Sequence, residues 1–198
     1  MSSKLILSAA LIALGGAAAA QDAPQATDGP GPNLLIEVAD SAGQSKGTIT
    51  LDLYADKAPG HVARLTELAK SGAYDGIVFH RVIDGFMAQT GDVQHGKQGG
   101  DTAMAGMGGS ELPDLAAEFS DVSFQQGTVG MARSQDPNSA NSQFFIDLAP
   151  ATFLDGQYTV VGQLVDGWDV LNAVKKGDAA ANGAVKDPDY MLKVTVAE

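Results

Sequence analysis

Alternating apolar and polar positions predict that most of this chain forms β-strands. Between residues 48 and 54, Ile49, Leu51 and Leu53 alternate with polar side chains, which is the period-two pattern of a half-buried strand. Comparable apolar, β-branched or aromatic runs, each bounded by turn residues, lie at Leu34–Val38, Ile77–Ile83, Phe86–Thr90, Thr128–Ala132, Gln143–Leu148, Tyr158–Leu164 and Tyr190–Val196. The pattern therefore predicts about eight strands.

Two segments have helical rather than strand periodicity. The first, Pro59–Ser71, begins with Pro, carries apolar residues at helical spacing and stops at Gly72. The second, Asp166–Lys176, has an apolar face and ends in two lysines before Gly177. Many short strands with two helices are typical of an all-β, closed antiparallel barrel whose ends the helices cover.

Residues 1–20 have the features of an export signal. A Lys near the start precedes an apolar run too short to span a bilayer, and Ala18–Ala20 form an Ala-x-Ala cleavage pattern. We expect cleavage before Gln21 and export, to the periplasm or to the outside of the cell. Residues 21–32 contain Pro and Gly without apolar periodicity, which predicts a flexible tether. One domain then follows over residues 33–198.

Composition narrows the possible partners and cofactors. With 24 acidic and 12 basic residues the formal net charge is −12, so electrostatic binding to nucleic acid or to an anionic membrane is not expected. The chain contains no Cys, which excludes disulfides and thiol chemistry. His61, His80 and His95 lack metal-ligand spacing, and no Ser-His-Asp or metalloprotease motif occurs. We therefore expect a monomer without a metal or another cofactor, and we disfavour a hydrolase.

The run from Phe79 to Gln89, Phe-His-Arg-Val-Ile-Asp-Gly-Phe-Met-Ala-Gln, sets two polar side chains among large apolar ones. A guanidinium or an amide removed from water needs hydrogen-bond partners. Arg81 and Gln89 therefore suggest a pocket that holds an apolar ring and donates hydrogen bonds to an amide beside it. From these residues alone, the alternative is a barrel strand with one Arg whose charged end reaches solvent.

A second run extends this pattern. Residues 130–147 read Gly-Met-Ala-Arg-Ser-Gln-Asp-Pro-Asn-Ser-Ala-Asn-Ser-Gln-Phe-Phe-Ile-Asp, and a Phe-Leu-Asp-Gly segment follows at residues 153–156. Together with Phe-His-Arg at 79–81 and Gly-Phe-Met at 85–87, these segments resemble the cyclophilins, a family of peptidyl-prolyl cis-trans isomerases. The resemblance covers about residues 34–197 and implies the cyclophilin fold, a closed eight-stranded antiparallel barrel with two capping α-helices.

The chemistry of this family requires a donor beside an apolar slot. Rotation about an X-Pro bond faces a barrier of about 18–20 kcal/mol, because amide resonance is lost. At the twisted geometry the prolyl nitrogen regains a lone pair, so a donor aimed at it stabilises the transition state more than either planar isomer. Arg is suited to this role because it is permanently charged and presents a rigid fork of donors. Since no proton has to move, we expect nearly constant activity around neutral pH.

The resemblance assigns roles by position. Arg81 falls on the catalytic arginine, and Gln89 on the glutamine that orients it and meets the substrate backbone. The hydrophobic proline pocket, with its edge named last, falls on Phe86, Met87, Phe145, Leu154 and Ile83. The segment that binds the residue before proline and the peptide main chain falls on Ala132, Arg133, Ser134 and Gln143. Phe144 is expected in the core, because it points to the opposite strand face from its neighbour.

Three positions depart from the common family pattern. Phe153 stands where many eukaryotic members carry a Trp associated with cyclosporin binding, which implies weak sensitivity to that drug. Tyr158 occupies a position often filled by His, and it can still close the pocket and donate a hydrogen bond. Arg133 replaces a common Asn, which preserves a main-chain contact and can alter peptide preference. None of these changes removes the arginine or the pocket.

The leading interpretation is an exported isomerase that acts on proline-containing peptides and on exported proteins as they fold. A second interpretation is a peptide-binding or chaperone module in which isomerisation is incidental, because Gln89, Gln143 and residues 132–134 would serve it equally well. The barrel pattern by itself also allows a small-ligand barrel, which a core filled with side chains would exclude.

Overall fold

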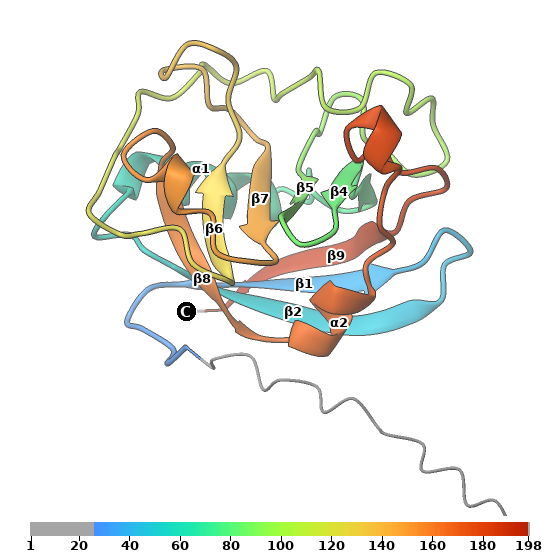
Figure 1. Cartoon of the computed structure of the whole chain (residues 1–198), viewed down its shortest axis with the longest axis horizontal. Helices are drawn as coiled ribbons and strands as arrows, with labels where there is room; N and C mark the ends of the chain where they lie inside the picture. The colour runs from blue at the N-terminus through green and yellow to red at the C-terminus, as the bar shows by residue number, and fades with distance from the viewer. Residues whose placement is uncertain (1–25, 198) are drawn as a thin grey trace, which may run out of the picture.

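A nine-stranded sheet, in which every pair of neighbouring strands is antiparallel, forms the body of the molecule (Figure 1). The computed structural model describes residues 26–197, so the expected leader and cleavage site lie outside the described part. The strands are β1 (Asn33–Ala39), β2 (Ser45–Leu53), β3 (Ile77–Val78), β4 (Arg81–Ile83), β5 (Met87–Thr90), β6 (Thr128–Met131), β7 (Phe144–Asp147), β8 (Val160–Asp166) and β9 (Tyr190–Ala197). Their order in the sheet is β3-β9-β1-β2-β8-β6-β7-β5-β4.

The expected all-β class and antiparallel pairing are confirmed, but the expected eight strands and closed ladder are corrected. The run at residues 77–83, predicted as one strand, forms two strands, β3 and β4, which lie at opposite ends of the sheet. Ile77 and Val78 pair with β9, whereas Arg81 begins the strand that pairs with β5. Between them, the Phe79 N–H donates to the Asp189 carbonyl and the ring is fully buried. The two end strands are thus joined by the chain and not by a hydrogen-bonded ladder.

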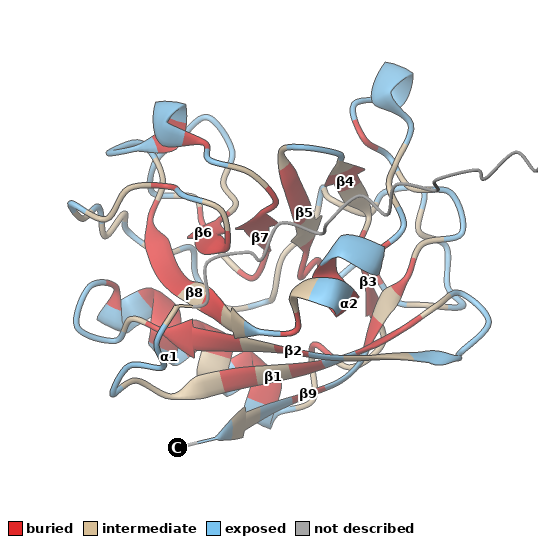
Figure 2. Cartoon of the chain, turned by 60° about the horizontal axis from the view of Figure 1, so that its bottom comes forward, coloured by how far each residue is buried: buried red, intermediate tan, exposed pale blue. Residues whose placement is uncertain are grey.

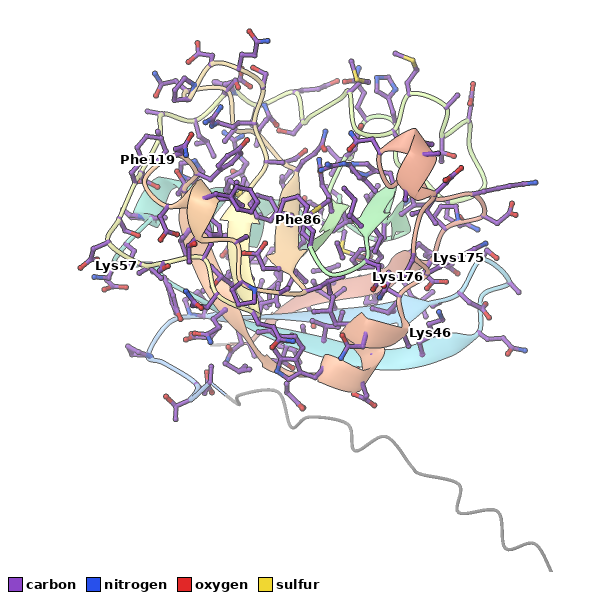
Figure 3. All side chains as sticks on the ribbon, viewed as in Figure 1. Lys46, Lys57, Phe86, Phe119, Lys175 and Lys176 are labelled. Carbon is purple, nitrogen blue, oxygen red and sulfur yellow. The ribbon has the colours of Figure 1, made fainter. Side chains whose placement is uncertain are left out.

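The two predicted helices are present, and the second is shorter than expected. Helix α1 spans Pro59–Lys70 and packs against β9, while α2 spans Trp168–Ala173 and packs against β2. Asp166 belongs to β8, so a left-handed Gly167 (φ 91°) has to turn the chain before α2 can begin. Lysines from both sides cover the end of α2: Lys46 donates to the Ala173 carbonyl and Lys176 to the Asn172 carbonyl (Figure 3). Two short 3-10 turns, η1 (Thr152–Leu154) and η2 (Ala179–Ala181), complete the elements.

None of the helices in the described part of the chain is long and apolar enough to cross a membrane.

Apolar side chains fill the interior that the curled sheet encloses. Figure 2 shows buried residues along the middle of β1, β2 and β8, with exposed residues at the loops. Phe144 belongs to this main core, as predicted, together with Tyr74, whose ring meets it edge to face at 5.8 Å. This filled interior argues against a small-ligand barrel. A second, smaller cluster consists of Met87, Phe124, Phe145, Ala151, Leu154 and Val160, and it lies beneath the site described below.

A long connection, residues 91–127, crosses above β4 to β7 without forming a helix or a strand of its own (Figure 1). Two carboxylates hold it in place. Asp92 accepts hydrogen bonds from four backbone N–H groups, those of Gln94, His95, Gly106 and Gly108, at 2.7–3.1 Å. Glu118 accepts from the Gly60 and His61 N–H groups and from His61 Nδ1 at 2.6 Å, so the connection also caps the start of α1.

Candidate active site

Strand register brings the predicted polar and aromatic residues together. Arg81 pairs with Gln89 in the β4–β5 ladder, and Gln89 pairs with Phe145 in the β5–β7 ladder. Directly paired residues project from the same side of a sheet. The three side chains therefore form a row across three neighbouring strands, with a charged fork at one end and a ring at the other.

Beside this row lies a slot with a volume of about 130 Å³, which has an apolar floor and polar groups at its walls. Its lining residues are Arg81, Phe86, Met87, Gln89, Ala132, Arg133, Phe145, Leu154 and Tyr158. Its floor is rigid, because Phe145 stacks on Phe124 (5.8 Å between centroids, 20° between planes) and Tyr158 meets Phe145 edge to face at 5.9 Å. An apolar cavity of about 150 Å³ can hold a benzene ring, so the slot has the size for one small ring.

The guanidinium of Arg81 is held by neutral oxygens. Its Nη1 donates to Gln89 Oε1 at 3.2 Å and lies 3.9 Å from Met87 Sδ, while Nε and Nη2 donate to Asn182. Within the described residues no carboxylate forms an ion pair with it. Partial burial lowers the pKa of Arg81, which still leaves an arginine fully protonated at neutral pH. A positive charge without a counter-ion therefore faces the slot.

A relay of amides extends from Arg81 to the long connection. Gln89 Nε2 donates to Gln143 Oε1 at 2.9 Å, and Gln143 Nε2 donates to the Gly108 carbonyl at 2.7 Å. Gly108 is itself held by the Asp92 carboxylate. The orientation of Gln89, and through it of Arg81, thus depends on how that connection is anchored.

A second hollow, which we name the groove, adjoins the slot. Its volume is about 370 Å³ and its lining residues are Gln89, Gly106, Met107, Gly108, Ala132, Arg133, Ser134, Ser139, Asn141 and Gln143. The slot and the groove share Gln89, Ala132 and Arg133. The groove combines glycine backbone, hydroxyl and amide groups with the Met107 and Arg133 side chains, and its larger volume suits an extended peptide better than a single ring.

The structure assembles most, but not all, of the predicted site residues around these two hollows. Phe86, Met87, Phe145, Leu154 and Tyr158 line the slot, as Arg81 and Gln89 do, and Ser134 and Gln143 line only the groove. Ile83 packs against the cluster under the slot without lining it. Phe153 is 63% exposed and packs on Phe86, the side chain that Figure 3 shows beside β7. These two residues thus support the slot from outside.

Arg133 stands on the boundary between the slot and the groove. Its guanidinium carbon lies 4.3 Å from the centroid of the Tyr158 ring, within the range of a cation–π contact. Its Nε and Nη2 donate to the Gln157 carbonyl, and Nη1 donates to the Ser134 carbonyl. The fork is therefore engaged by its own neighbours, and the departure from the common Asn builds a wall of the slot.

Two titratable groups near the slot have strongly shifted pKa values. Burial lowers the pKa of His80 to about 4, so its ring is neutral at pH 7. Burial raises the pKa of Asp147 to about 8, with a further contribution from Asp155. Both carboxylate oxygens of Asp147 are buried without a hydrogen-bond partner among the described residues. This side chain, which pairs in register with Met87 of the slot, is therefore mainly protonated at neutral pH.

Sequence reasoning missed three residues that shape the site. Asn182 binds the Arg81 guanidinium from a loop about a hundred residues away in the chain, Met107 lines the groove, and Asp92 anchors the wall of the groove. The Asn-Gly pair at residues 182–183 is a turn signal that could have marked that loop. Nothing in the sequence pattern indicated which side chain the loop would meet.

Comparison with known proteins places this geometry in a family. The family model for "Cyclophilin type peptidyl-prolyl cis-trans isomerase/CLD" matches residues 36–196. A "Probable peptidyl-prolyl cis-trans isomerase" from Brucella suis is 58% identical over 152 residues, which is 76% of this chain and 78% of that protein. A "Peptidyl-prolyl cis-trans isomerase-like 1" from Rhizopus delemar is 40% identical over 131 residues, covering 64% of this chain and 73% of that protein.

Solved structures are similar in fold. The cyclophilin AquaCyp293 from Hirschia baltica superimposes with a TM-score of 0.67 at 24% identity, covering 85% of this chain and 74% of that one. A cyclophilin-type isomerase from Cryptosporidium parvum, crystallised in the presence of the dipeptide Ala-Pro, gives a TM-score of 0.70 at 24% identity, covering 84% and 99% of the two chains.

Proposed function

Because this chain belongs to the cyclophilin family of peptidyl-prolyl cis-trans isomerases, we propose that it catalyses X-Pro rotation with Arg81 as the residue that stabilises the twisted imide. The proline ring of the substrate occupies the slot, and the preceding residues lie along the groove. The substrates are proline-containing peptides and exported proteins that are still folding.

The mechanism follows from where the charge is placed. In the planar imide the prolyl nitrogen shares its lone pair with the carbonyl and is a poor acceptor; at the twisted geometry the lone pair returns. A guanidinium N–H beside the slot meets this lone pair only in the transition state, which is the condition for catalysis. Arg81 has donors to spare for this, since Gln89 and Asn182 together take three of the five N–H groups that an arginine carries.

The slot supplies the rest of the acceleration. A rate increase of about five decades needs about 7 kcal/mol off the barrier. One charge-assisted hydrogen bond contributes about 1.5–3 kcal/mol. Holding the ring against Phe145 while the carbonyl turns, in surroundings from which water is largely excluded, must provide the remainder. Met87, Phe145 and Leu154 are each less than 10% exposed, so little apolar surface of the slot has to be desolvated before a ring packs on it.

The observation that carries the proposal is the Arg81 charge, without a carboxylate partner, at the wall of a ring-sized slot with an apolar floor. NMR exchange spectroscopy on an X-Pro peptide, analysed for the on-enzyme interconversion rate and the dissociation constant separately, tests it. In Arg81→Ala we expect the interconversion rate to fall about 10- to 100-fold, the loss of one charge-assisted hydrogen bond. Peptide affinity should change only a few-fold, because slot and groove remain.

Arg81→Lys serves as the matched control, because it keeps the charge and loses the planar fork. We expect a rate closer to that of the Ala variant than to that of the wild type. Equal interconversion rates in wild type and Arg81→Ala would remove the catalytic role of this side chain.

The size of the groove favours a second function, peptide binding that does not depend on isomerisation. A hollow of about 370 Å³ beside the slot offers contacts to chain segments that contain no proline. Suppression of aggregation of a proline-free client separates this function from catalysis. An effect undiminished in Arg81→Ala would support a chaperone activity, and no effect in wild type would exclude it.

A further inference from the structure

Two donors of the Arg81 guanidinium, Nε and Nη2, form hydrogen bonds with a single residue, Asn182. Asn182 accepts from Arg81 Nε through its backbone carbonyl at 3.0 Å, and from Nη2 through its side-chain Oδ1 at 3.1 Å. The two oxygens thus occupy one side of the guanidinium as a carboxylate would, but without its negative charge. Gln89 holds the guanidinium from the other side, at Nη1.

The backbone of Asn182 is in the left-handed region, with φ 54° and ψ 35°. Asn adopts this conformation more readily than most residues, and it turns the carbonyl and the side chain of one residue toward the same target. The loop around it is well anchored: the Val82 N–H donates to the Gly183 carbonyl at 2.8 Å, and the Gly183 N–H donates to the Asp178 carbonyl. A Cβ at Gly183 would collide with Ile83, so this close approach to β4 needs glycine.

We propose that Asn182 is a positioning residue that holds the Arg81 fork in its catalytic orientation while leaving its charge unpaired. This inference rests on the proposed role of Arg81. A flexible Arg side chain otherwise loses rotamer entropy when it engages the twisted imide, and Asn182 removes that loss in advance. A carboxylate could hold the same two donors, but it would neutralise the charge on which the mechanism depends.

Three variants separate the two contacts. Asn182→Gly keeps the left-handed backbone and the carbonyl acceptor but removes Oδ1. Asn182→Asp keeps an oxygen at that position and adds a negative charge. The matched control is Asp187→Gly, because Asp187 is the only other non-glycine residue with a positive φ (49°) among residues 26–197 and is also exposed. Its side chain is not among the hydrogen-bond partners of Arg81 within these residues.

Two measurements are made on each purified variant. The first is the on-enzyme interconversion rate and the dissociation constant for an X-Pro peptide. The second is ¹⁵N NMR of the arginine side chains. The Arg81 Nε signal and the rotation about its Nε–Cζ bond report directly on the hydrogen bonds between Arg81 and Asn182. Assignment is simple, since Arg64 and Arg133 are the only other arginines in the sequence.

For Asn182→Gly we expect faster Nε–Cζ rotation of Arg81 and a 3- to 10-fold lower interconversion rate, with the dissociation constant within twofold of wild type. Asn182→Asp should restore slow rotation, and Asp187→Gly should match the wild type in both measurements. The inference would be overturned if Asn182→Gly and Asp187→Gly had the same Arg81 NMR signals and the same interconversion rates. The NMR measurement does not depend on turnover, so it tests the contacts between Arg81 and Asn182 even if the wild type lacks isomerase activity.

Discussion

The slot and the groove share Gln89, Ala132 and Arg133, yet the two hollows are built in different ways. One side of the slot is made by side chains of β4, β5 and β7, whose places are set by ladder register, and the rest comes from turns that carry Phe86, Leu154 and Tyr158. The groove has a wall of irregular backbone at residues 106–108, which the carboxylate of Asp92 holds. The difference teaches that the slot is fixed in part by the ladders of the sheet, whereas the groove depends on a few polar anchors.

Removing the groove's anchor should produce the largest effect. In Asp92→Asn one of the two oxygens becomes an NH₂ group that faces backbone donors, so at least two hydrogen bonds to a charged acceptor are lost. We expect a decrease of about 3 kcal/mol in the free energy of unfolding, measured by urea titration. The interconversion rate should also fall, because Gly108 supports Gln143 and Gln89.

Asp101→Asn is the control for this change, since Asp101 is exposed in the same connection and accepts one N–H group, that of Ala103. This substitution should lower the free energy of unfolding by less than about 1 kcal/mol. Equal losses in both variants would show that Asp92 has no special part in holding the groove.

A matched pair of phenylalanines tests the slot. Phe145 lines it, while Phe144 points into the main core from the adjacent position of the same strand. We expect Phe145→Leu to lower kcat/KM about tenfold, since the flat surface that orients the ring is lost, a change of about 1.4 kcal/mol in the barrier. Phe144→Leu should lower the free energy of unfolding but leave kcat/KM within about twofold. Similar activities in the two variants would mean that strand packing in general, and not the slot, limits catalysis.

The two buried carboxylates should respond to pH in opposite directions. The folded-state pKa of Asp147, beside the slot, is raised from 3.8 to about 8, so the folded form binds the extra proton and stability falls progressively as pH rises from about 4 to about 8. Backbone donors lower the pKa of Asp92 at the groove, although burial opposes them, so its contribution is lost when pH falls through that depressed value.

Urea unfolding at a series of pH values checks this. Between pH 6 and 8 the free energy of unfolding of the wild type should fall by at least about 1 kcal/mol relative to that of Asp147→Asn, because each pKa unit corresponds to about 1.4 kcal/mol. Parallel curves for the two proteins would contradict the raised pKa. Activity itself should stay flat between pH 6 and 7, since the lowered pKa of His80, about 4, keeps its ring neutral there.

The smallest effect is expected at the boundary between the two hollows. Arg133→Lys keeps the charge over the Tyr158 ring but loses the fork that binds the Gln157 and Ser134 carbonyls. We expect kcat/KM to change by about twofold and the preference among residues before proline to broaden. Peptides that differ only at that residue provide the measurement. A change above tenfold on every peptide would place Arg133 among the residues that catalysis requires.

The sequence was a good guide to the slot and a poor one to its surroundings. Alternation placed Phe144 and Phe145 on opposite faces, and both the predicted core position of the first and the slot position of the second agree with the structure. Ile83, expected at the edge of the pocket, packs against the cluster under the slot, and Phe153 is an exposed ring that contacts the slot only through Phe86. The single strand predicted at residues 77–83 failed because apolar runs do not reveal where a chain turns from one edge of a sheet to the other.

What the sequence by itself determined is the set of strands, the all-β class and the family, because period-two patterns and long motifs are local properties of the chain. Only the tertiary structure decided that Asn182 holds Arg81 together with Gln89, the residue that the resemblance had assigned to orient it. Gln89 lies on the neighbouring strand, but Asn182 arrives from a distant loop, and Asp92 acts through the backbone of Gly108. Such contacts are polar, few and non-local, so they leave no periodic signal, and they become visible only when the folded sheet brings the segments together.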